Sequence, residues 1–176
     1  GLEMSARSIM YRLISLLGKI ELKKLFEAKN LSDSDFNEIE NSLSLLSRSK
    51  FFIDDTSSLS PSEILSRSRK LKRENPDLGL IIIDYMQLMR ADTRNDNRVS
   101  EMNEISRSLK ALAKEIDVPV IALSQLNRAP ETRTGKRPVL ADLKDSGAIE
   151  QDADIVTFVF RAEKYEQDLE LSLIHI

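Results

Sequence analysis

The sequence contains no cysteine and a single histidine, His175, which is the next-to-last residue. A disulfide framework and a thiolate metal site are therefore excluded, and a histidine-dependent triad or zinc site is not expected. Basic residues are not in excess either, because the formal net charge is −3. This balance excludes a protein that coats DNA with a broadly basic surface, but it allows a few local contacts to phosphates.

A secretory signal peptide is not found, and no apolar run approaches the ~20 residues of a membrane span. We therefore expect no membrane association and a cytoplasmic location. The 176 residues suffice for one domain with a sizeable core, and the apolar fraction of 41% is that of a globular chain.

Apolar residues recur along the chain at two kinds of spacing. Steps of three and four predict helices over residues 10–17, 36–46 and 99–116, and Ser32 or Asp33 is the expected N-cap of the second. The capping box Ser60-Pro61-Ser62-Glu63 predicts a further helix to about Arg73. Short apolar runs predict strands over residues 51–53, 80–84, 119–124 and 155–160. This alternation predicts an α/β fold with a mainly parallel sheet and helices on both faces.

Two successive predicted strands end in polar side chains. The apolar run from Leu80 ends in Asp84, as a Walker B strand buried on both faces would, and the next strand ends in Ser124 and Gln125. The carboxyl ends of adjacent parallel strands meet in one crevice. Asp84 could therefore orient hydrated Mg²⁺, and Gln125 could hydrogen-bond a terminal phosphate. A turn aspartate and a strand-end amide that satisfies loop backbone remain the alternatives.

Two further segments are weaker candidates. Glu3, just before the first helix, could polarise an attacking water, although position alone favours an acid that stabilises a helix N-terminus. Residues 142–147 contain Lys144 and Gly147 and could hold a phosphate, although composition alone favours a solvated turn. The long loop over residues 127–140 carries Arg128 among several basic residues.

Several long motifs in fixed order resemble the C-terminal RecA-like motor of the DnaB-type replicative DNA helicases. They occupy residues 1–5, 81–89, 104–115, 118–128, 136–138 and 142–154. The resemblance covers nearly the whole chain, to about Asp168.

The resemblance implies specific roles. Glu3 matches the glutamate that activates water, and Asp84 matches the Walker B aspartate. Gln125 matches the residue that senses the γ-phosphate and couples it to the DNA loops. Lys144, Asp145 and Gly147 match the loop that tracks single-stranded DNA, and Arg128 lies in a matching motif and is expected to contact DNA. Lys and Asp stand where many relatives carry Arg and Glu, so Lys144 loses bidentate phosphate geometry.

Other family features are not found in this sequence. No G-x-x-x-x-G-K-S/T motif occurs in the 176 residues, nor does the K-Q-R-N-G hairpin that supplies an arginine finger, nor the N-terminal scaffold domain. Residues 1–170 are therefore expected to be part of a motor domain truncated at both ends, inactive by itself. Residues 171–176 look like a non-native tail from sequencing-adaptor read-through, with a native edge strand as the alternative.

The function that the resemblance implies is an ATP-driven helicase motor, which uses ATP and Mg²⁺ and translocates on single-stranded DNA as a homohexamer. Primase and a helicase loader are the further partners it implies. One alternative is another RecA-fold ATPase, RadA-like or KaiC-like, against which the long match over residues 124–154 argues. The other is a binding module that kept the fold and lost the phosphate-binding loop.

Overall fold

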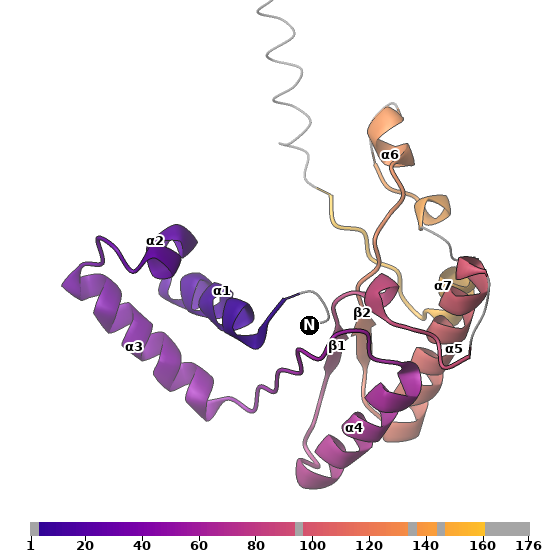
Figure 1. Ribbon diagram of the computed structural model, residues 1–176, viewed down its shortest axis with the longest axis horizontal. Helices are drawn as coiled ribbons and strands as arrows, with labels where there is room; N and C mark the ends of the chain where they lie inside the picture. Colours follow the sequence, from indigo (N-terminus) through magenta and orange to yellow (C-terminus); the bar gives the residue numbers. More distant parts are fainter. Residues whose placement is uncertain (1–3, 94–96, 134–136, 144–146, 161–176) are drawn as a thin grey trace, which may run out of the picture. The chain divides into compact units, whose positions relative to one another are not determined.

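The computed structural model describes residues 4–93, 97–133, 137–143 and 147–160. The chain divides into two compact units, an N-terminal unit of Gly1–Ser58 and a C-terminal unit of Leu59–Ile176. Length alone predicts one domain, but residues 50–56 form no helix or strand and connect the helices on either side. Each unit is therefore described by itself (Figure 1).

The N-terminal unit consists of the helices α1 (Ala6–Gly18), α2 (Leu22–Glu27) and α3 (Asp33–Arg48). Ser32 is the N-cap of α3, because its hydroxyl accepts the Asp35 N–H at 3.1 Å while the Asp35 carboxylate accepts the Ser32 N–H at 2.9 Å. The buried core consists of Ile14, Ile20 and Leu25. The predicted stripe on α3 is only partly correct, since Phe36 and Leu43 are exposed.

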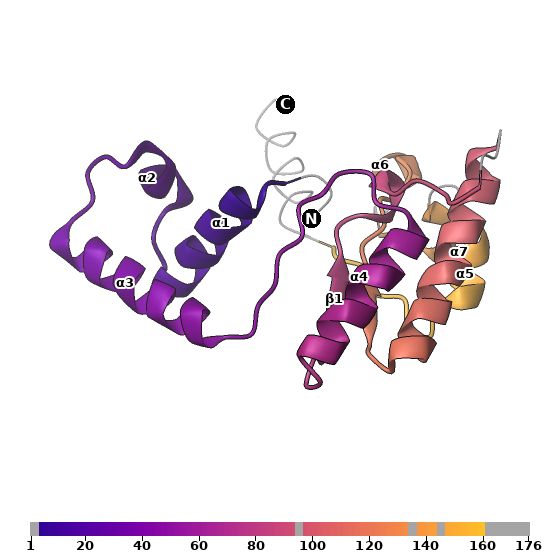
Figure 2. The ribbon, with the colours of Figure 1, turned by 60° about the horizontal axis from the view of Figure 1, so that its bottom comes forward.

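The C-terminal unit contains a two-stranded parallel sheet and the helices that pack beside it. Strand β1 (Ile81–Ile83) pairs with β2 (Val120–Ala122) in the register Ile82↔Ile121, which confirms parallel pairing. Helix α4 (Pro61–Glu74) begins at the predicted capping box. Helix α5 (Arg98–Ile116) connects the two strands and packs against α4 and α7 (Gly147–Asp152) (Figures 1 and 2).

Helix α5 provides most of the core of this unit. Met102 and Ile105 are completely buried, and Leu109 and Leu112 follow on the same face. The sheet contributes Ile83, whereas Ile82 and Ile121, which point to the opposite face, are exposed at 57% and 51%. Within the described residues, the strands are thus buried on one face rather than on both.

Two predicted strands do not form. Residues 51–53 and 155–160 lie outside every helix and strand of the described chain. Burial still alternates along the second segment, where Val156 and Phe158 are half-buried while Ile155 and Val159 are exposed. Alternating apolar residues determine which face of a segment is buried. A strand also needs a neighbouring strand with which it exchanges backbone hydrogen bonds.

Candidate nucleotide and DNA site

The candidate site begins where β1 and β2 end side by side. The N–H of Leu123 donates to the carbonyl of Ile83 at 2.9 Å, and the N–H of Met86 donates to the carbonyl of Leu123 at 2.9 Å. Asp84 therefore lies beside the start of the Leu123–Gln125 segment. This confirms that the two polar strand ends share one edge of the sheet.

The Asp84 carboxylate is the first candidate for binding a ligand at this edge of the sheet. It is half-buried, and among the residues that the structure describes it has no hydrogen-bond or ion-pair partner. Directly after it, through a cis peptide bond to Tyr85, the chain enters the short helix η1 (Met86–Leu88). A turn aspartate of the ordinary kind would accept a local backbone N–H. The structure thus favours the interpretation in which the carboxylate serves a bound group.

Gln87 of η1 joins the two strand ends, and sequence reasoning missed it. Its side-chain nitrogen donates to the Ser124 hydroxyl at 2.9 Å, and its side-chain oxygen accepts the backbone N–H of Gln125 at 3.2 Å. The side chain of Gln125 is left exposed at the same edge. The signal in the sequence was an amide three residues after Asp84, within an otherwise apolar run.

The residues at this edge fit hydrated Mg²⁺ with a phosphorylated nucleotide. Within the described ranges no three acidic or histidine side chains gather into a metal cage. A single available carboxylate suits Mg²⁺, which keeps most of its waters and takes further ligands from phosphates. When bound, Mg²⁺ would neutralise phosphate charge, with Asp84 holding its water shell and Gln125 donating to a terminal phosphate.

The loop after β2 carries the candidate DNA contacts. Leu126 pairs with Leu143 in an antiparallel bridge, so both ends of the loop lie together. Arg128 is exposed immediately before the short helix α6 (Ala129–Thr132). Gly147 begins α7, and a Cβ built there would meet no atom of the described residues within 4 Å. Glu3, Lys144 and Asp145 lie outside the described residues, and their roles stay predictions.

Asp142, near the end of the same loop, lies in the short helix η2 (Leu140–Asp142) and is buried, with an exposed fraction of 1%. Its carboxylate accepts from both terminal nitrogens of Arg133 at 2.8 Å. The Arg133 guanidinium lowers the pKa of this carboxyl, assisted by the Val139 N–H. Asp142 is therefore a structural anion, which sequence reasoning did not single out.

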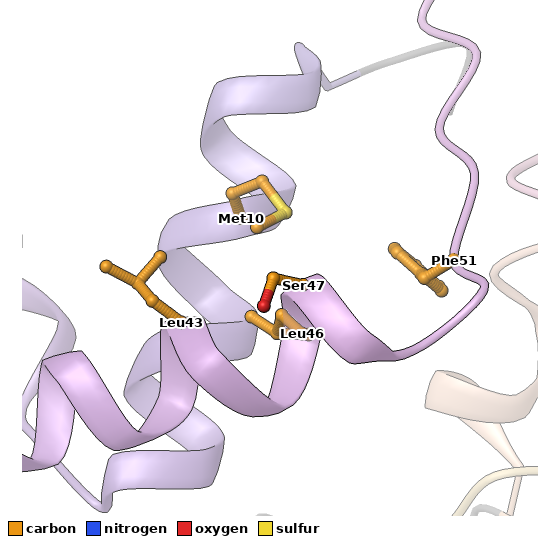
Figure 3. Close-up of a pocket in the computed structure, with 5 residues that line it drawn as sticks. All are labelled: Met10, Leu43, Leu46, Ser47 and Phe51. Carbon is orange, nitrogen blue, oxygen red and sulfur yellow. The ribbon is translucent and has the colours of Figure 1, made fainter.

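A pocket in the N-terminal unit offers no competing site. It has a volume of about 190 Å³ and is lined by Met10, Leu43, Leu46, Ser47 and Phe51 (Figure 3). Its lining holds one hydroxyl and no charged side chain, so it lacks the groups that would hold a phosphate.

Comparison with known proteins decides the family. Residues 1–174 match the family described as the DnaB-like helicase C terminal domain. This chain belongs to the DnaB-like helicase family. It is 49% identical over 171 residues to the replicative DNA helicase DnaB of Haemophilus influenzae, and 50% identical over 171 residues to that of Pasteurella multocida.

Both alignments cover 97% of this chain but only 36% and 37% of those relatives. The chain thus spans little more than a third of the curated DnaB relatives it matches. Because these relatives are replicative helicases, the comparisons do not favour the RadA-like or KaiC-like alternative.

Solved structures support the same family. A DnaB-like replicative helicase, described with its interactions with primase, has a TM-score of 0.90 at 40% identity, over 94% of this chain and 41% of that chain. A second solved structure, of an ATPase domain, has a TM-score of 0.91 at 40% identity, over 95% and 60%. The RecA-like α/β fold class is therefore confirmed. No helix within the described ranges of this DnaB-like chain has the length and apolar character of a membrane span.

Proposed function

We propose that this chain forms part of the ATP-driven motor of a replicative DNA helicase, which unwinds duplex DNA by translocating on single-stranded DNA as a homohexamer. The observation that supports it best is the half-buried Asp84 carboxylate, available beside the exposed Gln125 at one edge of a parallel sheet. The family and the 49–50% identity to replicative helicases support the substrate class. The resemblance to the family adds two further points to this proposal. Primase and a helicase loader are its partners, and the protein is located in the cytoplasm.

In this proposal each residue does one task. Asp84 orients the water shell of Mg²⁺, Gln125 donates to the γ-phosphate of ATP, and Glu3 takes the proton of the attacking water. Gln87 fixes the backbone from which the Gln125 side chain projects, because it accepts the Gln125 N–H. Single-stranded DNA is contacted by Arg128, Lys144, Asp145 and the backbone of Gly147.

The test of the nucleotide roles uses a chimera, in which this sequence replaces the matching segment of the Haemophilus influenzae helicase. Asp84→Asn removes the charge that holds Mg²⁺ and should lower ATP turnover by about 100-fold or more, since such charge stabilisation is worth several kcal/mol. The control is Asp117→Asn at the C-cap of α5, where φ is 50° and asparagine is well tolerated.

If Asp84→Asn and Asp117→Asn hydrolyse ATP at equal rates, Asp84 has no role in the nucleotide site. A chimera that binds ATP and single-stranded DNA but never hydrolyses ATP, when the parent helicase does, would favour the non-catalytic binding module. The 176-residue chain by itself should release no phosphate above its own Asp84→Asn variant, because it contains no motif that cradles the β- and γ-phosphates.

The DNA contact is tested by salt dependence in the same chimera. Lys144→Ala should weaken binding to single strands of every sequence alike. It should also flatten the slope of log affinity against log salt by about 0.7 per engaged subunit, the value for one phosphate contact. Lys110→Ala, on α5 and paired with Asp154, is the control for loss of a lysine charge. A sequence-selective defect or an unchanged slope would exclude Lys144 from the DNA contact.

A further inference from the structure

The Gln87 side chain connects η1 to the segment after β2 by two hydrogen bonds whose directions are fixed. The N–H of Gln125 can only donate, so the amide oxygen of Gln87 must face it, at 3.2 Å. The amide nitrogen of Gln87 then faces Ser124, whose hydroxyl oxygen accepts at 2.9 Å. One half-buried side chain thereby holds two successive residues of this segment.

The Gln87 backbone is held in turn by Arg98, in the first turn of α5. A short helix such as η1 leaves its last carbonyl groups without partners of its own. One terminal nitrogen of Arg98 donates to the carbonyl oxygen of Gln87, 11 residues earlier in the chain. The other terminal nitrogen donates to the Glu101 carboxylate at 2.7 Å. The first turn of α5 therefore holds η1 at the residue whose side chain reaches Gln125.

We propose that Arg98 is a positioning residue for ATP hydrolysis, and that it acts through Gln87 on the segment that carries Gln125. Arg98 touches neither the nucleotide nor the reacting atoms in this role. It sets where the Gln125 side chain lies relative to Asp84, at the end of the neighbouring strand. This inference deepens the proposed function and rests on it for its kinetic readout.

Two other roles for Arg98 fit its contacts less well. An exposed arginine beside a glutamate of its own helix is ordinarily a surface pair that contributes little. Such a pair does not reach a second element, whereas Arg98 also binds the backbone of η1. A direct contact with a phosphate would need unengaged donors, and both terminal nitrogens of Arg98 are engaged.

Arg69 on α4 provides the matched control. Its guanidinium is also exposed and also pairs with a glutamate of α5, Glu115, near the opposite end of that helix from Arg98. Arg69→Met therefore removes the same charge and the same kind of ion pair, but it leaves the contact between α5 and η1 in place.

The first test measures kcat and KM for ATP in the chimera with the Haemophilus influenzae helicase. Arg98→Met and Gln87→Met should each lower kcat about tenfold, because a misplaced Gln125 loses a contact that strengthens as charge develops on the γ-phosphate. KM should stay within about twofold, since the contact is made mainly in the transition state.

Rescue by a conservative replacement is part of the same test. Arg98→Lys keeps a donor for the Gln87 carbonyl and should restore kcat to within about threefold of the unmodified chimera. The Arg69→Met control should keep kcat within about twofold, because an exposed pair contributes little. Equal losses of kcat in Arg98→Met and Arg69→Met would assign the effect to surface charge and overturn the proposal.

A double-variant cycle distinguishes positioning from a general loss of stability. If Arg98 acts through Gln125, Arg98→Met should cost nothing further in a chimera that already carries Gln125→Ala. If the two losses of kcat multiply, Arg98 does not act through Gln125 and the proposal is wrong. A rise in KM at unchanged kcat in Arg98→Met would indicate that Arg98 contacts ATP directly, and it would also overturn the proposal.

The second test does not depend on ATP hydrolysis and follows amide hydrogen exchange of the 176-residue chain. The Gln125 amide should exchange about tenfold faster in Gln87→Met and in Arg98→Met. Gln87→Glu should keep the protection, because a carboxylate accepts the Gln125 N–H and the Ser124 hydroxyl can turn to donate to it. The Leu123 amide, which is bonded to β1, should keep its protection in all three variants.

The exchange data separate the failure of this inference from the failure of the proposed function. Unchanged exchange at Gln125 in Arg98→Met would overturn the positioning role, whatever the rate of ATP hydrolysis. Faster exchange at both Gln125 and Leu123 would show a general opening of the sheet and would overturn it too. If Gln125 alone loses protection, but Gln125→Ala leaves ATP turnover unchanged, the contact is retained and the proposed role of Gln125 in ATP hydrolysis is refuted.

Discussion

The two units of this chain use their apolar residues differently. In the N-terminal unit the helices α1, α2 and α3 bury a small cluster, and large apolar side chains such as Leu16 and Phe26 are exposed at 74% and 53%. In the C-terminal unit α5 connects two parallel strands and buries Met102 and Ile105 completely. A helix layered on a sheet gains contacts from several elements at once, whereas helices that pack only on one another, as the described ones of the N-terminal unit do, each bury one narrow stripe.

The difference bears on the proposed function, because Asp84 and Gln125, the described residues that we propose for the nucleotide site, belong to the C-terminal unit. Asp84 and Gln125 project from strand ends whose backbones are held by α5 and η1. A site of this kind needs side chains held within fractions of an ångström, which strand ends packed against a buried helix such as α5 provide. The comparison therefore predicts that damage to the core has different consequences in the two units.

The largest effect is expected from truncation of the core. Ile105→Ala removes a completely buried side chain of α5 and should lower the free energy of unfolding of the C-terminal unit by about 3–5 kcal/mol. Ile14→Ala, where the side chain is 8% exposed in a smaller core, should cost about 2–3 kcal/mol and affect only the N-terminal unit. Amide exchange during denaturant unfolding, followed separately in α5 and α1, measures both. Equal losses in both units would contradict the comparison.

A smaller effect is expected at the two capping boxes. Ser60→Ala should cost about 1–2 kcal/mol, because Ser60 is 4% exposed and its hydroxyl also contacts Ser62, which binds Asp92. Ser32→Ala, at an exposed cap, should cost about 0.5–1 kcal/mol. Exchange of the first-turn amides of α4 and α3 reports each loss, with Ser47→Ala in α3 as a control. A larger loss at Ser32 would reverse the order.

The smallest effect concerns acid. The Ser60 N–H and then the Arg90 guanidinium lower the pKa of Glu63, and the Ser32 N–H and hydroxyl lower the pKa of Asp35. Because both pKa values are lower in the folded state, the stabilisation is complete above the unfolded values, about 4.3 and 3.9, and is lost as pH falls through the folded ones. The stability of α4 should therefore fall less steeply with decreasing pH in Glu63→Gln, and that of α3 should fall less steeply in Asp35→Asn. Amide exchange between pH 6 and 3 measures this dependence. If it is unchanged in either variant, that carboxylate does not contribute to the loss of stability in acid.

Much of the fold was predictable from local signals. Four elements formed where short-range patterns predicted them. These patterns are the Ser60 capping box, the apolar stripe over residues 99–116 and the two apolar runs that form β1 and β2. The predicted strands over residues 51–53 and 155–160 were wrong because a strand is defined by its partner. Helix α2, with six residues between turns, was too short to show a period.

The site was predictable only in part. Asp84 and Gln125 follow from their places at strand ends, and parallel pairing confirmed that they share an edge. Gln87 and the Arg133–Asp142 pair were missed, since their importance lies in contacts 37, 38 and 9 residues away along the chain. Asp142 has a structural role because it is buried and paired with Arg133. The composition of a basic loop does not predict which of its arginines forms an ion pair.

The sequence by itself determined where the helices start, which runs are apolar enough for strands, and which family the motifs resemble, because these depend on residue types at short, regular spacing. Only the tertiary structure decided that Asp84 keeps an available carboxylate, that Gln87 bridges the strand ends, and that Asp142 is buried against Arg133. The physical reason is that hydrogen bonding and desolvation depend on which distant groups meet, and that is settled by packing.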